Sequence, residues 1–189
     1  MKITKKKVSL PWFTKVELKK DMETFNISQD ELLNNVFLNL HSQSDKIITG
    51  KLGESLLFNM RETNDIILKA LLKKKLNESE SGILRNIFIS YSMKPQYQRE
   101  KIVFLDIFTT IEKAIQLSEK IVIQINGAGR KVSPYFIARN EEEEHNYLFC
   151  YCEKNKEYRA YRVANIKKIK YINVLSEKVD EIDIIYKKQ

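Results

Sequence analysis

The stretch that decides the fold runs from Asn146 to Ile166 and reads NYLFCYCEKNKEYRAYRVANI. Apolar and aromatic residues dominate 146–152, a charged run follows at 153–157, and tyrosines and arginines alternate with small apolar residues at 158–163. Short apolar runs separated by a polar run are typical of two antiparallel strands joined by a turn. This stretch therefore predicts a β-hairpin.

Further short strands are predicted on both sides of this hairpin. Hydrophobic residues recur at every second position from Ile121 onward, and a turn sequence, Asn-Gly-Ala-Gly, lies at 126–129. The predicted strands are 121–125, 131–139, 146–152, 158–163 and one within 166–174. Five short antiparallel strands suit a small SH3/Sm-like barrel, because a barrel closes on itself and leaves no exposed edge.

The two strands of the hairpin resemble the signature strands of the WYL domain. In that family a Trp-Tyr-Leu run precedes a turn and the pattern Arg-x-Phe-Arg-Leu-Asp-Arg-Ile, and this chain has Asn-Tyr-Leu at 146–148 and Arg-Ala-Tyr-Arg-Val-Ala-Asn-Ile at 159–166. The helix expected at 111–117 and the Val-Ser-Pro-Tyr run at 132–135 fit the family as well. The resemblance covers about residues 100–175. Two departures are Asn146 in place of the Trp and Ala164-Asn165 in place of the acidic-basic pair.

This resemblance implies a ligand groove on the barrel. WYL domains are similar to Sm-like barrels, and they are taken to bind nucleic acid or nucleotide-like ligands, often as the sensor half of a bacterial regulator. Carried onto this sequence, the groove would use Tyr135, Tyr147, Arg159, Tyr161 and Arg162, with Ser133 at its margin. Arginine offers a planar fork for phosphate and tyrosine a stacking face for a base. The alternative is that the tyrosines pack in the core while the arginines extend to solvent.

The N-terminal region predicts a strand followed by two helices. Residues 5–11 alternate as a short strand that ends at Pro11, and from about Thr14 the apolar residues follow helical spacing. Ser28 is a suitable N-cap for a second helix, with Glu31 three positions on as in a capping box. Strand, helix, turn and helix in this order resemble a ribbon-helix-helix domain.

That resemblance implies a dimer that binds DNA. A lone strand cannot form a sheet, so a second copy of the chain would complete the ribbon, whose polar face enters the major groove. The outward residues would be Lys5, Lys7 and Ser9, and the backbone near Ser28 would hold a phosphate. Lys6 departs from the pattern, since it falls on the inward face. The alternative is a helical hairpin with a basic tail.

The whole chain is therefore expected to be an α+β protein of several parts. These are a ribbon-helix-helix-like segment at 1–44, a helical connector at 45–99, a five-stranded WYL-like barrel at 100–175 and a C-terminal tail at 176–189. Within the connector, leucines and other apolar residues at 52–72 suggest one helical stripe.

Charge and composition limit the classes of function. The net charge is +8, and residues 1–20 hold seven lysines against one glutamate, which suits a polyanion or merely keeps the protein soluble. No run of about 18 apolar residues and no signal-peptide pattern occurs, which together with two neighbouring cysteines favours a cytoplasmic location. The sequence shows no metal-ligand spacing, no phosphate-binding glycine loop and no catalytic set around its two histidines. We therefore expect no cofactor, no metal, no membrane partner and no enzymatic activity.

Two functions fit this description. The first is a homodimeric transcriptional regulator whose ribbon contacts DNA while its barrel binds a nucleic-acid or nucleotide-like ligand. The second is an accessory protein that binds single-stranded RNA or DNA and modulates an RNA-guided CRISPR effector, since some WYL proteins found beside such effectors pair a similar N-terminus with a barrel. Sequence-specific duplex binding would support the first function, and sequence-tolerant single-strand binding the second.

Overall fold

The computed structural model divides the chain into two compact units, which are described separately. The first unit comprises residues 1–105 and the second residues 106–189. The residues whose structure is described are 3–42, 52–53, 55–74, 78–140, 142 and 144–176. The predicted C-terminal tail therefore lies outside the described residues except for Ser176, and so does part of the predicted connector.

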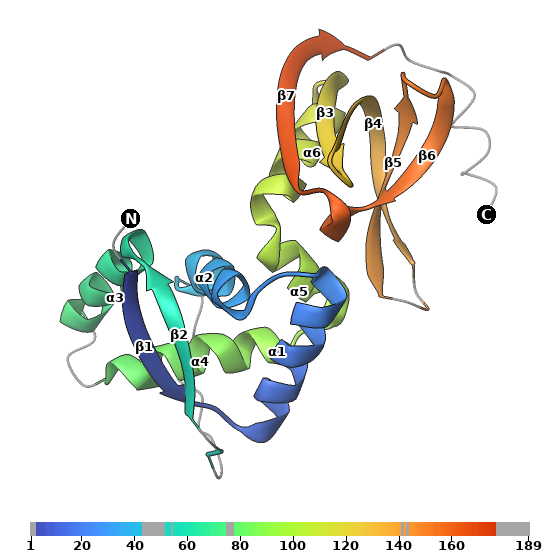
Figure 1. Cartoon of the computed structure of the whole chain (residues 1–189). Helices are drawn as coiled ribbons and strands as arrows, with labels where there is room; N and C mark the ends of the chain where they lie inside the picture. Colours follow the sequence, from blue (N-terminus) through green and yellow to red (C-terminus); the bar gives the residue numbers. More distant parts are fainter. Residues whose placement is uncertain are drawn as a thin grey trace. The chain divides into compact units, whose positions relative to one another are not determined.

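The first unit contains two strands and five helices among its described residues (Figure 1). They are β1 (Ile3–Ser9), α1 (Trp12–Phe25), α2 (Gln29–Leu40), β2 (Ser55–Arg61), α3 (Glu62–Lys74), α4 (Glu80–Ser92) and α5 (Gln96–Val103). The predicted order of strand, helix and helix is observed at the N-terminus. Ser28 caps α2 as expected, because its Oγ accepts a hydrogen bond from the backbone N–H of Glu31 at 3.2 Å.

The helix expected across 52–72 is wrong in its first half, where the chain forms β2. Leu56 and Met60 are four positions apart, a spacing that fits one face of a helix and equally every second residue of a strand. Burial shows the strand period, because Phe58 and Met60 are buried while Leu57 is 62% exposed. The edge of β1 supplies the hydrogen-bonding partner that makes the strand stable, and this long-range contact has no local signal in the sequence.

β1 and β2 pair antiparallel and form a two-stranded ribbon (Figure 1). Lys6 lies opposite Phe58 at the centre of the pairing, and Ser9 lies opposite Ser55 at one end. The expectation that a second copy of the chain supplies the partner strand is wrong, because β2 of the same chain occupies that edge. The homodimer was expected because a lone strand needs a pairing partner, and β2 of the same chain supplies that partner.

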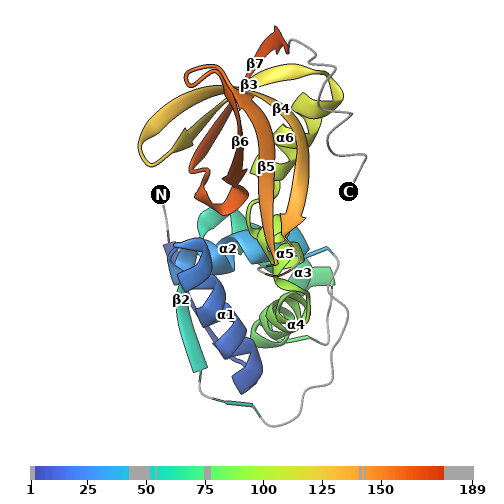
Figure 2. The ribbon, with the colours of Figure 1, turned by 90° about the vertical axis from the view of Figure 1, so that its right-hand side faces the viewer.

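The helices of the first unit cover one face of the ribbon. The core contains Val8, Leu33, Phe37, Met60, Leu84 and Phe88, all fully buried. α1 and α4 lie side by side (Figure 2). Asp21 of α1 joins three helices there, since its carboxylate accepts hydrogen bonds from the Tyr91 hydroxyl on α4 at 2.6 Å and from Arg99 Nε on α5 at 2.7 Å.

The second unit is a helix followed by a five-stranded antiparallel sheet. Its elements are α6 (Leu105–Gln116), which begins at the unit boundary, β3 (Glu119–Ile125), β4 (Ala128–Asn140), β5 (His145–Cys152), β6 (Glu157–Arg162), the 3₁₀ helix η1 (Val163–Asn165) and β7 (Lys168–Leu175). The strand order is β6-β5-β4-β3-β7, and the sheet is strongly curved (Figure 2). All five predicted strands are present. Closure into a barrel stays a prediction, because β6 and β7 end this order and no ladder between them occurs in the described part of the chain.

Two features are absent from the described residues. None of the helices there is long and apolar enough to cross a membrane. Within the same residues, no cluster of three or more His, Cys, Asp or Glu side chains has the arrangement of a metal site.

Candidate nucleic-acid interfaces

The outer face of the ribbon carries the residues predicted to contact DNA. Lys5 and Lys7 of β1 are exposed, whereas the alternate residues Lys6 and Val8 are buried. Ser9 is half-buried, and its Oγ lies 2.9 Å from the Oγ of Ser55 across the ribbon. The structure thus presents two lysine side chains from one strand on a surface that the pairing with β2 holds in place.

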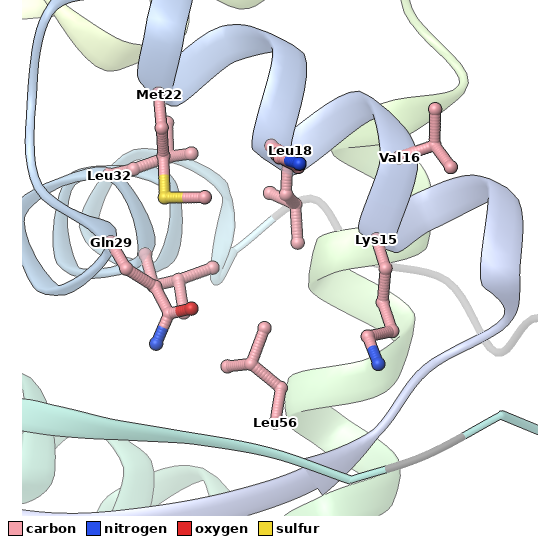
Figure 3. Close-up of a pocket in the computed structure, with 9 residues that line it drawn as sticks. Lys15, Val16, Leu18, Met22, Gln29, Leu32 and Leu56 are labelled. Carbon is pink, nitrogen blue, oxygen red and sulfur yellow. The ribbon is translucent and has the colours of Figure 1, made fainter.

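An apolar groove lies beside the ribbon, between α1, α2 and β2. In Figure 3 the side chains of Leu18, Met22 and Leu56 point into a common space. Lys15 and Gln29 stand on either side of it. The cavity has a volume of about 300 Å³. Sequence reasoning did not identify this groove, because its walls come from three elements that only the fold brings together.

The predicted groove residues of the second unit divide between two faces of the sheet. Tyr147 lies directly opposite Arg162, so these two side chains share one face. Arg159 and Tyr161 lie opposite Cys150 and Leu148, which are fully buried, so they belong to the other face. Alternation along β6 gives the same division, because Arg159 and Tyr161 are two positions apart while Arg162 directly follows Tyr161.

The outer face, which carries Tyr147 and Arg162, also carries a cluster of aromatic rings. We call it the aromatic face, and its members are Tyr135, Phe136, Phe149, Tyr151 and Tyr158. The Phe149 ring is near-parallel to the rings of Phe136, at 4.9 Å between centroids, and Tyr158, at 5.9 Å. All five side chains retain exposed surface, and Tyr158 is 39% exposed. Partly exposed rings on a sheet are the surfaces on which unpaired bases stack.

Alternation along β5 could have located most of this face. Tyr147, Phe149 and Tyr151 occupy every second position, and only one of them was included in the predicted groove. Phe136 was missed for a different reason. The ladder between β4 and β5 shifts register between Pro134 and Phe136, so simple counting along β4 assigns the wrong side of the sheet.

The opposite face holds polar groups near its edge. Arg159 Nε donates to Glu157 Oε1 at 2.7 Å, and this contact raises the pKa of the guanidinium. Burial raises the pKa of the Tyr161 phenol. Ser133, predicted at the groove margin, is instead on the side of the aromatic face, because it lies opposite Tyr151 in the ladder, and it is only 4% exposed. Arg159 and Tyr161 therefore cannot act on one flat surface with Tyr147 and Arg162.

The two cysteines lie inside the second unit and are reduced. Both are fully buried and share the inward face of β5, as the sequence predicted. Burial raises the pKa of Cys150 to about 12. Burial also opposes ionisation of Cys152, but hydrogen bonds from the backbone of Asn155 and from Tyr161 outweigh it and lower the pKa of that thiol.

The residues that depart from the WYL pattern differ in solvent exposure. Asn146, in place of the Trp, is 7% exposed and points inward from β5. Ala164 is buried within η1, and Asn165, which replaces the basic residue of the family pattern, is exposed. The position that is basic in the family pattern is therefore a neutral, exposed side chain in this protein.

Comparison with known proteins agrees with this geometry. Residues 106–171 match the model of the WYL domain. A solved structure described as "Crystal structure of a CRISPR Cas-related protein" is similar to this chain, with 16% sequence identity and a TM-score of 0.60. The matched region covers 96% of this chain and 65% of the chain in that structure. The chain thus spans about two thirds of the length of that protein, and at this identity the likeness concerns the fold alone.

A second solved structure is proteasome accessory factor B/C (PafBC) of Arthrobacter aurescens, with 12% sequence identity and a TM-score of 0.37. The matched region covers 85% of this chain and 30% of the chain in that structure. No curated protein matches the chain. The family match falls on α6 and the five strands whose hairpin carries the signature residues. By this match, residues 106–171 of this chain correspond to a WYL domain.

Proposed function

We propose that this protein is a non-enzymatic, nucleic-acid-binding regulator. In this proposal the ribbon of the first unit contacts duplex DNA, and the WYL domain binds a nucleic-acid or nucleotide-like ligand on its aromatic face. The two activities lie in different units, so each can be removed without altering the other.

The observation that carries the proposal is the lysine pair on the ribbon. Lys5 and Lys7 are exposed side by side on one face of β1, while the opposite face of the strand is buried under helices. A two-stranded ribbon fits the major groove of B-DNA, and lysines bind phosphates or the acceptor edge of guanine there. α1 adds the exposed residues Lys19 and Lys20 to the same unit.

The ligand of the WYL domain is inferred from the aromatic face. Tyr158 and its neighbours offer ring surface for a base, and Arg162, opposite Tyr147, offers a guanidinium for a phosphate. Arg162 NH2 lies 3.3 Å from His145 Nδ1.

The second candidate function is that of an accessory protein which binds single-stranded RNA or DNA and modulates an RNA-guided CRISPR effector. The aromatic face favours it, because stacking on exposed rings is tolerant of sequence. The description of the similar structure as CRISPR Cas-related motivates the choice of partner. As such an accessory protein, it would bind single-stranded RNA or DNA more tightly than duplex DNA.

Binding of three labelled nucleic acids at two salt concentrations tests both candidates. The probes are duplex DNA, single-stranded DNA and single-stranded RNA, and the variants are Lys5→Ala/Lys7→Ala and Tyr158→Ala/Arg162→Ala. Lys73→Ala/Lys74→Ala is the matched control, since it removes two exposed charges from α3 rather than from the ribbon. Loss of duplex binding in the ribbon variant alone, with the salt slope reduced by about 2, supports the regulator.

Each other outcome has a defined meaning. Loss of single-strand binding in the Tyr158→Ala/Arg162→Ala variant, with weak duplex binding throughout, supports the accessory protein. Equal losses in the ribbon variant and the α3 control would show that binding depends only on net charge, and the proposed ribbon contact would then be wrong. Absence of binding to all three probes by the wild type would contradict both candidates.

A further inference from the structure

The first unit is built from two copies of one motif. Residues 3–40 form a strand and two helices, and residues 55–92 form a strand and two helices in the same order. The two strands bury the same positions, because Lys6 and Val8 of β1 correspond to Phe58 and Met60 of β2. Lys6 and Phe58 also lie opposite each other, so the antiparallel pairing is centred on corresponding residues.

The second helices of the two motifs have similar sequences. When Ser28 is aligned with Ser79, LLNNVFLN at 32–39 falls on ILRNIFIS at 83–90. Ser28 and Ser79 are both N-caps, and each Oγ accepts a hydrogen bond from the backbone N–H three residues later, at 3.2 Å and 3.1 Å. The same N-cap hydrogen bond therefore begins both α2 and α4.

The contacts between the motifs are reciprocal. Asn34 on α2 and Arg85 on α4 are corresponding residues, and each reaches the strand of the other motif. Asn34 Nδ2 donates to the carbonyl of Asn59 on β2 at 2.9 Å, and Arg85 Nε donates to the carbonyl of Ser9 on β1 at 2.8 Å. The two motifs are thus interlocked as the halves of a symmetric dimer would be.

The first residues of α2 and α4 also form hydrogen bonds to the strand of the other motif. Gln29 Nε2 donates to the carbonyl of Leu57 on β2 at 2.8 Å. Its counterpart Glu80 accepts from Lys6 Nζ on β1, also at 2.8 Å. The geometry points to an internally duplicated, single-chain ribbon, and we propose that it recognises an asymmetric duplex DNA site as one chain. This inference rests on the proposed function for its DNA ligand, although not for the single-chain ribbon itself.

A ribbon made from two β1 strands would be less stable than the one observed. The same centre of pairing would place Lys6 opposite a second Lys6, and like charges directly opposite each other destabilise a strand pair. In the β1–β2 ribbon, the buried ammonium of Lys6 instead pairs with Asp65 on α3 at 2.7 Å and with Glu80 on α4 at 2.8 Å. Both acids belong to the second motif, so the charge pairs select β2 as the partner.

The two halves of the reading surface differ in chemistry, and this difference makes the DNA site asymmetric. The exposed Lys5 and Lys7 of β1 correspond to Leu57 and Asn59 of β2. Leu57 is 62% exposed, and an apolar side chain in the major groove suits a thymine methyl group rather than guanine. A homodimeric ribbon presents identical halves and reads a palindrome, whereas this ribbon presents one basic and one largely neutral half.

Two measurements on the 189-residue chain test the inference. In the first, hydrogen exchange of the β1 amides is followed from low to high micromolar protein, with the mass of the particle determined at each concentration. We expect a monomer with concentration-independent protection of β1. Protection that appears only when dimers form would overturn the single-chain ribbon, whether or not the protein binds DNA.

In the second measurement, duplexes are selected from a random pool, and the ratio of chain to duplex is determined by native mass spectrometry. We expect a non-palindromic site with one chain bound. We also expect Leu57→Lys, which makes β2 resemble β1, to shift the selected site toward symmetry, while the control Leu57→Ala does not. A palindromic site holding two chains would overturn the proposal. Absence of any selected duplex would refute the proposed DNA function and leave the ribbon to be judged by hydrogen exchange.

Discussion

At the scale of single residues, Lys6 shows how the fold accommodates a charge on an inward position. Burial by itself would lower the pKa of its ammonium, but hydrogen bonds to Asp65 and Glu80 outweigh burial and raise it. Hydrogen bonds from Lys6 and Lys69 lower the pKa of the Asp65 carboxyl. Removal of one partner from such a pair is costly, because the remaining charge stays buried without full compensation.

These shifts predict how the stability of the first unit depends on pH. The pKa of Asp65 is lowered on folding, so its contribution is present above the unfolded value of about 4 and is lost as the pH falls through the folded value. The pKa of Lys6 is raised, so its contribution is present below about 10.5 and is lost at higher pH. We expect stability to fall below about pH 4, and urea denaturation between pH 2 and 7 measures this.

The variant Asp65→Asn isolates this effect. It should lower the free energy of unfolding at pH 7 by about 3 kcal/mol, since it leaves the buried Lys6 with one partner, and it should flatten the acid dependence. Lys69→Met is the control, because Lys69 is 65% exposed and its pairing with Asp65 should contribute about 0.5 kcal/mol. Equal effects of the two variants would contradict a special role for the buried pair.

At the scale of elements, the junction of α1, α4 and α5 depends on Asp21. This carboxylate is fully buried and accepts hydrogen bonds from Arg99 Nε at 2.7 Å and Arg99 NH2 at 2.9 Å, in addition to the bond from Tyr91. Paired donors in this geometry fix both distance and orientation. The junction therefore sets how the three helices meet beneath the ribbon.

Removal of the charge of Asp21 should loosen this junction. We expect Asp21→Asn to cost about 3 to 5 kcal/mol, because the buried guanidinium of Arg99 loses its buried anionic partner and keeps the half-exposed Glu17. Tyr91→Phe should cost about 2 kcal/mol for one bond to a charged group. Glu17→Gln is the control, expected below about 1 kcal/mol. A urea midpoint unchanged in Asp21→Asn would contradict this assignment.

At the scale of the whole molecule, each unit has a core of its own. Leu84 is fully buried in the first unit and Leu148 in the second, so Leu84→Ala and Leu148→Ala form a matched pair of substitutions. Each should cost about 2 to 5 kcal/mol locally. We expect calorimetry of the full chain to show two transitions, with each variant lowering only one of them. A single transition lowered by both variants would show that the units unfold together.

The sequence by itself determined the elements that depend on local patterns. Alternating residues from Ile121 onward predicted all five strands of the second unit, because a half-buried strand repeats every two residues. Ser28 and the spacing that follows it predicted the start of α2. The signature residues at 146–166 identified the WYL domain, which the family match confirms. These features needed no knowledge of distant contacts.

The tertiary structure decided which residues meet. The sequence did not show that Ser55–Arg61 is a strand, since only pairing with β1 stabilises it there. It also left Lys6 unexplained, because Asp65 and Glu80 are remote in the chain and become partners only through α3 and α4. The aromatic face depended on a register shift in β4 that residue spacing does not encode. Local periodicity fixes elements, whereas the choice of partner is a long-range competition that only the folded chain resolves.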